Sequence, residues 1–218
     1  KQVSRGRILP VQFPFDLVEP FAHRARKEGV TLNSALNAAL LLSINRHLYA
    51  GEELPMRTFS FADLRPYVTP PLPAENLGLF ISMMRYTVDV NSGDFWSLVR
   101  DLHQKIYDSL KSGDKFVAAI MVEGLMKMVT RFNSFRMGTS ALNYTGVVPV
   151  QTDYGMTKVV GIHGFVSAYG LGPEFASQAQ LFNDRLFWDF TYLEEDMDEG
   201  MVKAIVDEIK GILKSVID

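Results

Sequence analysis

The chain has 218 residues, of which 47% are hydrophobic and 22% are charged, and it contains no cysteine. This length and composition suffice for one large domain with its own core, and the lack of cysteine excludes disulfides, thiol nucleophiles and cysteine-ligated metal sites. The 22 basic and 25 acidic residues give a net charge of −3, which argues against nucleic acid as the main partner, because phosphate binding needs a clustered positive surface.

Local patterns predict the secondary structure along the chain. Leucine or isoleucine recurs every four residues after Thr31, so a buried helix is expected there. Thr31 itself is a residue type that favours the N-cap position of a helix. Asn183 and Asp184 suit a tight hairpin turn, and Asp196 resembles the cap of a final helix. The expected strands are 8–15, 56–62, 79–90, 140–144, 159–167, 175–182 and 186–192, and the expected helices are 16–28, 31–49, 94–111, 115–132 and one that begins at 196.

The order of these elements indicates the fold class. Strands and helices do not alternate strictly, which makes a Rossmann or barrel fold a poor match. We therefore predict an α/β (α+β) two-layer sandwich, with a mixed β-sheet and helices packed on it, formed by residues 1–218 as a single domain.

Targeting signals are absent from the sequence. The first residues lack the apolar stretch of a secretory signal, and the longest apolar run, 116–122, is too short to span a bilayer. These features predict a cytoplasmic protein without a membrane span. The chain begins at Lys1 without an initiator methionine, which we interpret as a processed chain or a fragment of a longer one.

Most catalytic signatures are also missing. The sequence has no phosphate-binding glycine loop and no metal-ligand spacing among its four histidines, so no bound metal or cofactor is expected. His163 lies between Gly161 and Gly164, where small neighbours would let a ligand approach; the alternative is an ordinary histidine in a sheet. The acidic run 194–199 fits the start of a helix, where the helix dipole favours negative charge.

Three motifs follow one another at a recognisable spacing. They are a Gly-Val-Thr-Leu-Asn helix start at 29–33, Asp63-Leu64-Arg65-Pro66 followed by Asn76-Leu77-Gly78-Leu79-Phe80-Ile81-Ser82, and Asn143-Tyr144-Thr145-Gly146. This pattern resembles the C-terminal half of the chloramphenicol-acetyltransferase-like superfamily, over nearly the whole chain. That superfamily includes condensation domains of nonribosomal peptide synthetases, alcohol acetyltransferases and wax ester synthases.

The resemblance implies an acyltransferase built from two similar halves with a tunnel between them. In this family the general base belongs to a His-His-x-x-x-Asp motif at the end of the first half, and this sequence contains no His-x-x-x-Asp. The chain is therefore expected to be a C-terminal half without a catalytic residue, inactive alone. Its expected partners are its own N-terminal half-domain, an acyl-CoA or acyl-carrier-protein thioester as co-substrate, and a small-molecule acceptor with a hydroxyl or amine.

The resemblance also suggests substrate-binding residues on the tunnel side. Asp63 and Arg65 match a pair that could hold the tunnel by a charge-assisted hydrogen bond, or form a surface ion pair. Further matches in the family motifs are Gly78, Phe80, Ser82, Asn143, Tyr144 and Gly146, and His163 completes the candidate site. Condensation domains usually carry Asn where Ser82 stands. Asn143 could donate to a developing oxyanion or be an ordinary strand asparagine.

Other interpretations remain open from the sequence. The same fold could serve as a non-catalytic binding or assembly module, and the chain could form a homodimer through an exposed half-interface. A third possibility is an acyltransferase of another fold that uses His163 as its base. The methionine-rich helix with Met121, Met126 and Met128 could line an acyl pocket or belong to the core.

Overall fold

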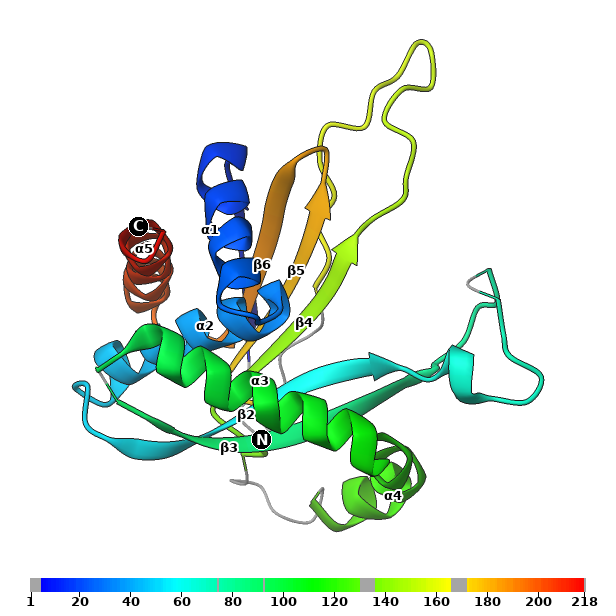
Figure 1. Ribbon diagram of the computed structural model, residues 1–218, viewed down its shortest axis with the longest axis horizontal. Coiled ribbons are helices and arrows are strands. Elements are labelled where there is room, and N and C mark those ends of the chain that lie inside the picture. The colour runs from blue at the N-terminus through cyan, green and yellow to red at the C-terminus, as the bar shows by residue number, and fades with distance from the viewer. Residues whose placement is uncertain (1–4, 74, 92, 130–135, 166–171, 218) are drawn as a thin grey trace.

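The computed structural model describes residues 5–73, 75–91, 93–129, 136–165 and 172–217 (Figure 1). The strands and helices are β1 (Gly6–Phe13), α1 (Phe15–Lys27), α2 (Leu32–Leu48), β2 (Leu54–Asp63), the 3-10 turn η1 (Arg65–Tyr67), β3 (Ile81–Val90), α3 (Phe95–Ser112), α4 (Asp114–Val129), β4 (Ser140–Val147), β5 (Phe175–Phe182), β6 (Arg185–Leu193) and α5 (Glu199–Ser215).

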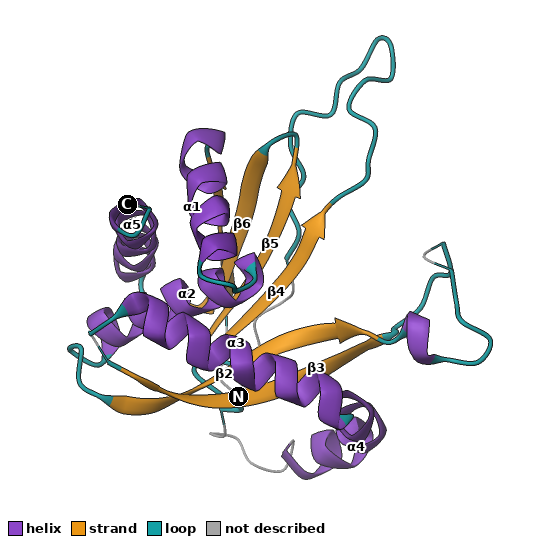
Figure 2. Cartoon of the chain, viewed as in Figure 1, coloured by secondary structure: helices purple, strands orange, loops and turns teal. Residues whose placement is uncertain are grey.

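The strands form one mixed sheet in the order β1-β6-β5-β4-β2-β3. β4 runs parallel to β2 and to β5, while the other neighbouring strands are antiparallel. The helices pack on one face of this sheet (Figure 2), and we call the opposite face the helix-free face. This arrangement confirms the predicted two-layer α/β fold with a mixed sheet.

The sheet splits between β2 and β4. These strands are in register only at Thr58 with Ser140 and at Phe59 with Ala141, and beyond that point the β2–β3 hairpin turns away from the other strands (Figure 1). A buried chain of hydrogen bonds secures the junction. Ser140 donates to Thr58 at 2.9 Å, and Thr58 donates to Asn37 of α2 at 2.9 Å. The junction therefore joins α2, β2 and β4 through polar side chains that water does not reach.

Helix α2 forms the centre of the core, as its leucine repeat predicts. Leu36, Leu40 and Ile44 are fully buried, and polar Ser34 on the same helix is buried as well. Thr31 caps the helix by accepting the backbone N–H of Ser34 at 3.2 Å, which confirms the predicted N-cap. Because α2 contacts helices α3 and α5 on either side, it is buried around most of its circumference.

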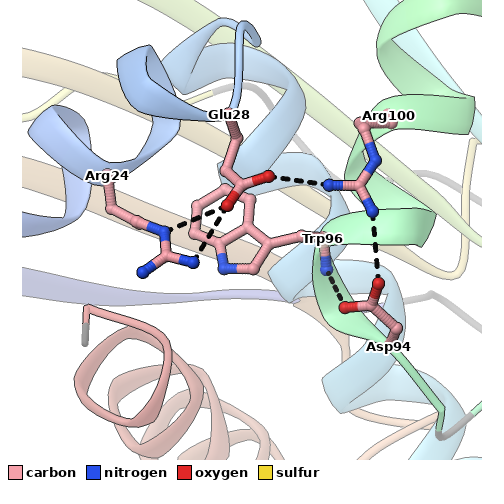
Figure 3. Close-up of polar contacts among 5 residues, drawn as sticks. All are labelled: Arg24, Glu28, Asp94, Trp96 and Arg100. Carbon is pink, nitrogen blue, oxygen red and sulfur yellow. Dashed lines mark hydrogen bonds and ion pairs between the residues drawn. The ribbon is translucent and has the colours of Figure 1, made fainter.

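A cluster of charged side chains ties α1 to the start of α3 (Figure 3). Glu28, next to the end of α1, accepts from Arg24 at 2.9 Å and from Arg100 at 2.7 Å. Arg100 also donates to Asp94 at 3.2 Å, and Asp94 caps α3 by accepting the N–H of Trp96. The guanidinium of Arg24 lies 5.7 Å from the centre of a Trp96 ring. Each charge in the cluster thus faces an opposite charge or an aromatic ring.

Two predictions about local structure are wrong. The expected strand 159–167 is not a strand over 159–165, because its backbone bonds to side chains of the sheet rather than to a neighbouring strand: Gln180 donates to the carbonyl of Ile162. The final helix is capped by Asp198, which accepts the N–H of Met201 at 2.8 Å, and Asp196 instead pairs with Arg136. Residues 130–132 and 166–167 of the expected elements lie outside the described residues.

The hairpin between β5 and β6 confirms its prediction. Asn183 and Asp184 have φ angles of 48° and 58°, the left-handed geometry that this two-residue turn requires. The turn sets the register of the two strands, which places Gln178 of β5 opposite Asp189 of β6.

Candidate functional site

Four of the predicted site residues meet in the loop that joins β2 to β3. Asp63 ends β2 and accepts from the backbone N–H of Arg65 at 3.0 Å and from its guanidinium at 3.2 Å. Arg65 also donates to the carbonyl oxygen of Asn76 at 3.2 Å, and its guanidinium lies 5.1 Å from the centre of the Phe80 ring. A Cβ on Gly78 would lie 2.5 Å from that ring. Through these contacts the motif holds the two ends of the loop together.

Ser82 lies on the other face of the hairpin, under the helices. Its hydroxyl donates to the carbonyl oxygen of Lys115 at 2.5 Å, at the start of α4. The ammonium of Lys115 lies 4.4 Å from the centre of the Tyr67 ring and 4.8 Å from that of Phe116. Ser82 thus anchors α4 to the hairpin, while Asp63 and Arg65 hold the loop.

The third motif lies on β4, next to a β-bulge. The β4–β5 register shifts between Tyr144 and Val147, and Gly146 in this stretch has a φ of 75° that favours glycine. Tyr144 packs against the main core, and burial raises its pKa. Beyond the bulge, residues 148–158 form an arm that projects away from the sheet (Figure 1). The arm therefore begins at the bulge.

A row of polar side chains crosses the helix-free face. Asn143 of β4 is in register with Gln178 of β5, and Gln178 is in register with Asp189 of β6. Paired residues of neighbouring strands share a face and lie about 5 Å apart, so the three side chains form a continuous line that we call the polar row.

Residues 161–164 lie across the polar row. Nδ1 of His163 is 2.5 Å from Oδ1 of Asp189, and the backbone N–H of Gly164 donates to Oδ2 of Asp189 at 2.8 Å. A Cβ on Gly161 would lie 2.7 Å from the Phe187 ring, which shows how closely the backbone approaches the sheet. The polar row thus links two predicted site residues: His163 lies on Asp189, and Asn143 lies two strands away along the row.

Sequence reasoning missed Asp189 and Gln178. The signal for Asp189 is visible, since it is the single charged residue between Leu186 and Leu193, where the other residues are aromatic or threonine. A charge that folding buries needs a partner. Nothing in the sequence identifies His163 as that partner, because it lies 26 positions away.

Other expected features have a simpler outcome. Among the described residues, no three His, Asp or Glu side chains come close enough to hold a metal ion, and no helix is long and apolar enough to cross a membrane. Met121 is exposed on α4 rather than part of the core. The side chains of Met126 and Met128 lie outside the described residues.

Residues 19–180 match the protein family described as the C-terminus of phthiocerol/phthiodiolone dimycocerosyl transferase, abbreviated PapA. The chain belongs to this family of PapA C-terminal domains. No curated protein matches the chain in sequence.

Solved structures with this domain's fold come from acyl-transferring and peptide-synthesising enzymes. Trichothecene 15-O-acetyltransferase from Fusarium sporotrichioides superposes with a TM-score of 0.77 at 13% identity, over 98% of this chain and 47% of the other. The epimerization domain of tyrocidine synthetase B gives 0.68 at 14%, over 97% and 48%. The PapA2 acyl transferase gives 0.65 at 17%, over 98% and 45%.

These similarities confirm the predicted superfamily and fold. The PapA C-terminal domain has the chloramphenicol-acetyltransferase-like half-domain fold, and the chain spans about half the length of the three structures it resembles. The fold contradicts the third interpretation above, an acyltransferase of another fold that uses His163.

Proposed function

We propose that this domain is the C-terminal half of an enzyme that transfers an acyl group from a thioester to a hydroxyl or amine. The supporting observation is the match of residues 19–180 to the C-terminal domain of a dimycocerosyl transferase. The thioester is acyl-CoA or an acyl carrier protein, and the acceptor is a small molecule. A cytoplasmic location stays a prediction.

In this role the catalytic base comes from an N-terminal half-domain, since the sequence carries no His-x-x-x-Asp. This domain contributes β4 and the loop between β2 and β3 to the donor side of the tunnel. Asn143 donates a hydrogen bond to the oxyanion that develops as the acceptor attacks the thioester. Asp63 and Arg65 keep the loop in place and do not take part in the chemistry.

Exposed apolar side chains on η1 and α4 support a protein partner. Large apolar residues there are 40% to 81% exposed, namely Tyr67, Phe116, Val117, Ile120 and Met121. Single domains rarely expose so much apolar surface in one region. An N-terminal half would cover it, and the same surface would serve the alternative function, a non-catalytic assembly module. Homodimerisation through this surface stays a prediction.

Reconstitution tests this proposal. An N-terminal half of a PapA-type acyltransferase that carries His-His-x-x-x-Asp is mixed with this domain, and mass spectrometry measures the ester formed from acyl-CoA and a long-chain alcohol. We expect product from the pair and none from either half alone. A second mixture with the catalytic histidine changed to alanine is the control. Product from this domain alone, or none from a pair shown to associate, contradicts the proposal.

A further inference from the structure

The pairing of His163 with Asp189 joins an exposed imidazole to a buried carboxylate. Asp189 has no exposed surface, whereas 42% of the His163 side chain is exposed. Because Nδ1 of the ring faces Asp189 at 2.5 Å, the edge that carries Nε2 faces away from the sheet. The imidazole therefore has one nitrogen engaged by the protein and one directed outward.

The ring is held in place from several sides. Its plane stands at 88° to that of Phe187, with the ring centres 5.1 Å apart. Gln180 holds the preceding residue, Ile162, by its carbonyl oxygen at 2.9 Å, and Asp189 holds the following residue, Gly164, by its N–H. Such contacts fix the direction of Nε2, as a base in a reaction requires.

The carboxylate also selects the state of the ring. An ionised carboxylate accepts hydrogen bonds and donates none, so a neutral His163 must carry its proton on Nδ1 to bond with Asp189. Nε2 then keeps its lone pair. The aspartate of a catalytic triad orients its histidine in the same way.

We propose that His163, oriented by Asp189, is a general-base site on the helix-free face that takes a proton from water or from a hydroxyl-bearing ligand. The amide of Gln178, which also donates to Gln180 at 3.3 Å, is in register with Asp189 one strand away and suits a carbonyl oxygen of the same ligand. The class of substrate is thus an ester with a carbonyl exposed to attack. This site uses only this chain, so it does not depend on the proposed N-terminal half.

The reaction balances with water and an activated ester such as p-nitrophenyl acetate. Nε2 of His163 accepts a proton from water as the water oxygen bonds to the carbonyl carbon. The carbon–oxygen bond to the leaving group then breaks, and p-nitrophenolate departs with its electron pair. The imidazolium returns its proton to the solvent and the acetic acid formed loses a second proton there, so acetate and the phenolate are the products and His163 is regenerated.

Hydrolysis of p-nitrophenyl acetate by the isolated domain is the first test. We expect His163→Ala to lower the enzyme-dependent rate by about 100-fold, the low end of what a positioned base contributes. His23→Ala, which removes an exposed histidine on α1, is the matched control and should keep the full rate. An unchanged rate in His163→Ala would overturn the proposal, and so would an equal loss in the control.

The second test separates a base from a merely structural histidine. Nitrogen NMR of the labelled domain distinguishes the two neutral forms of a histidine ring. We expect the proton on Nδ1 in His163, and Asp189→Asn should abolish that preference and slow hydrolysis. If Asp189→Asn does not fold, His163→Gln provides the second variant: it should fold and lack hydrolysis. A proton on Nε2 in the unaltered domain contradicts the proposal.

Discussion

The guanidinium of Arg65 donates to the carbonyl oxygen of Asn76, eleven positions along the chain and 3.2 Å away in space. The same side chain pairs with Asp63 and lies over the ring of Phe80. A single arginine therefore contacts the beginning, the far side and the end of the loop between β2 and β3. In the proposed enzyme this loop belongs to the tunnel, so its shape depends on one residue.

Replacement of Arg65 by alanine should loosen the loop without unfolding the domain. The pair with Asp63 is partly exposed, so we expect a loss of about 1 kcal/mol in the free energy of unfolding. Hydrogen exchange of the backbone amides over 66–80 should accelerate, whereas exchange in β5 and β6 should not change. Arg65→Lys is the control, because it keeps the charge but cannot reach Asp63 and Asn76 with a fork of donors. Equal protection of the loop amides in the unaltered domain, Arg65→Ala and Arg65→Lys would contradict the role of Arg65 in holding the loop together.

Gly146 should be intolerant of a side chain for a backbone reason alone. A Cβ there would meet no atom within 4 Å, but the φ of 75° is strained for other residues. We expect Gly146→Ala to cost about 1–2 kcal/mol of stability. Gly124→Ala on exposed helix α4 is a matched control with equally open space. It should stabilise the domain by about 0.5–1 kcal/mol. Urea unfolding of both variants checks the opposite signs, and a neutral Gly146→Ala would refute the strain at the bulge.

The cap of α5 can be tested by two aspartate substitutions. Asp198→Ala removes the acceptor for the N–H of Met201 and should cost about 1 kcal/mol. Asp196→Ala removes the pair with Arg136 and leaves the cap intact. Hydrogen exchange of the first turn of α5 should accelerate only in Asp198→Ala. Faster exchange of that turn in Asp196→Ala would instead support Asp196 as the cap, as the sequence pattern predicts.

The cluster around Glu28 should respond to salt. Glu28 accepts from Arg24 and Arg100, so Glu28→Gln leaves two arginines without their shared carboxylate. We expect a loss of about 1 kcal/mol at low salt and less in concentrated salt, which screens these partly exposed charges. Arg100→Ala with Glu28→Gln completes a double-mutant cycle, measured by denaturant unfolding. A coupling energy of zero between the two residues would show that the pair does not stabilise the domain.

Buried Tyr86 and half-buried Tyr49 predict a loss of stability at high pH. Burial raises the pKa of Tyr86 to about 12, and burial followed by the hydrogen bond to Glu174 raises the pKa of Tyr49 to about 12. An unfolded tyrosine titrates near pH 10, so the folded state holds these protons longer. Their contribution is complete below about pH 10 and is lost as the pH rises toward 12.

Unfolding by urea at about pH 9 and about pH 11 measures this effect. We expect Tyr49→Phe and Tyr86→Phe each to show a smaller loss of stability between the two pH values than the unaltered domain. Tyr154→Phe, at an exposed position on the arm, should match the unaltered domain. If all variants lose stability equally, other groups cause the alkaline transition.

Local structure was predictable where neighbouring residues determine it. The leucine repeat of α2 and its cap at Thr31 depend on contacts within one helix, and Asn183 and Asp184 determine their own turn. The cap of α5 was placed two residues early, because Asp196 and Asp198 both suit a cap and the ion pair to Arg136 decides between them. That ion pair spans 60 positions and leaves no local mark in the sequence.

The candidate site was predictable only in its parts. The Asn-Tyr-Thr-Gly motif pointed to Asn143 and the flanking glycines pointed to His163, and the structure connects both through the polar row at Gln178 and Asp189. This juxtaposition follows from strand register and from the path of residues 161–164. These residues pack on the sheet through side-chain contacts that leave no periodic pattern in the sequence. The same contacts explain why residues 159–165 are not the strand that was expected.

The narrow junction between β2 and β4 is the line along which the sheet has the least backbone pairing. A long ladder of paired residues joins β2 to β3, and long ladders also join β1, β6, β5 and β4. The β2–β4 junction, by contrast, pairs residues at only two positions. Partial opening along this line therefore breaks fewer hydrogen bonds than any other separation of the sheet. Backbone amides that bond across the β2–β4 junction should exchange before those within either ladder. The hairpin can then separate from β4 while the remaining strands keep their hydrogen bonds, and α3 still holds it to α2 in the core.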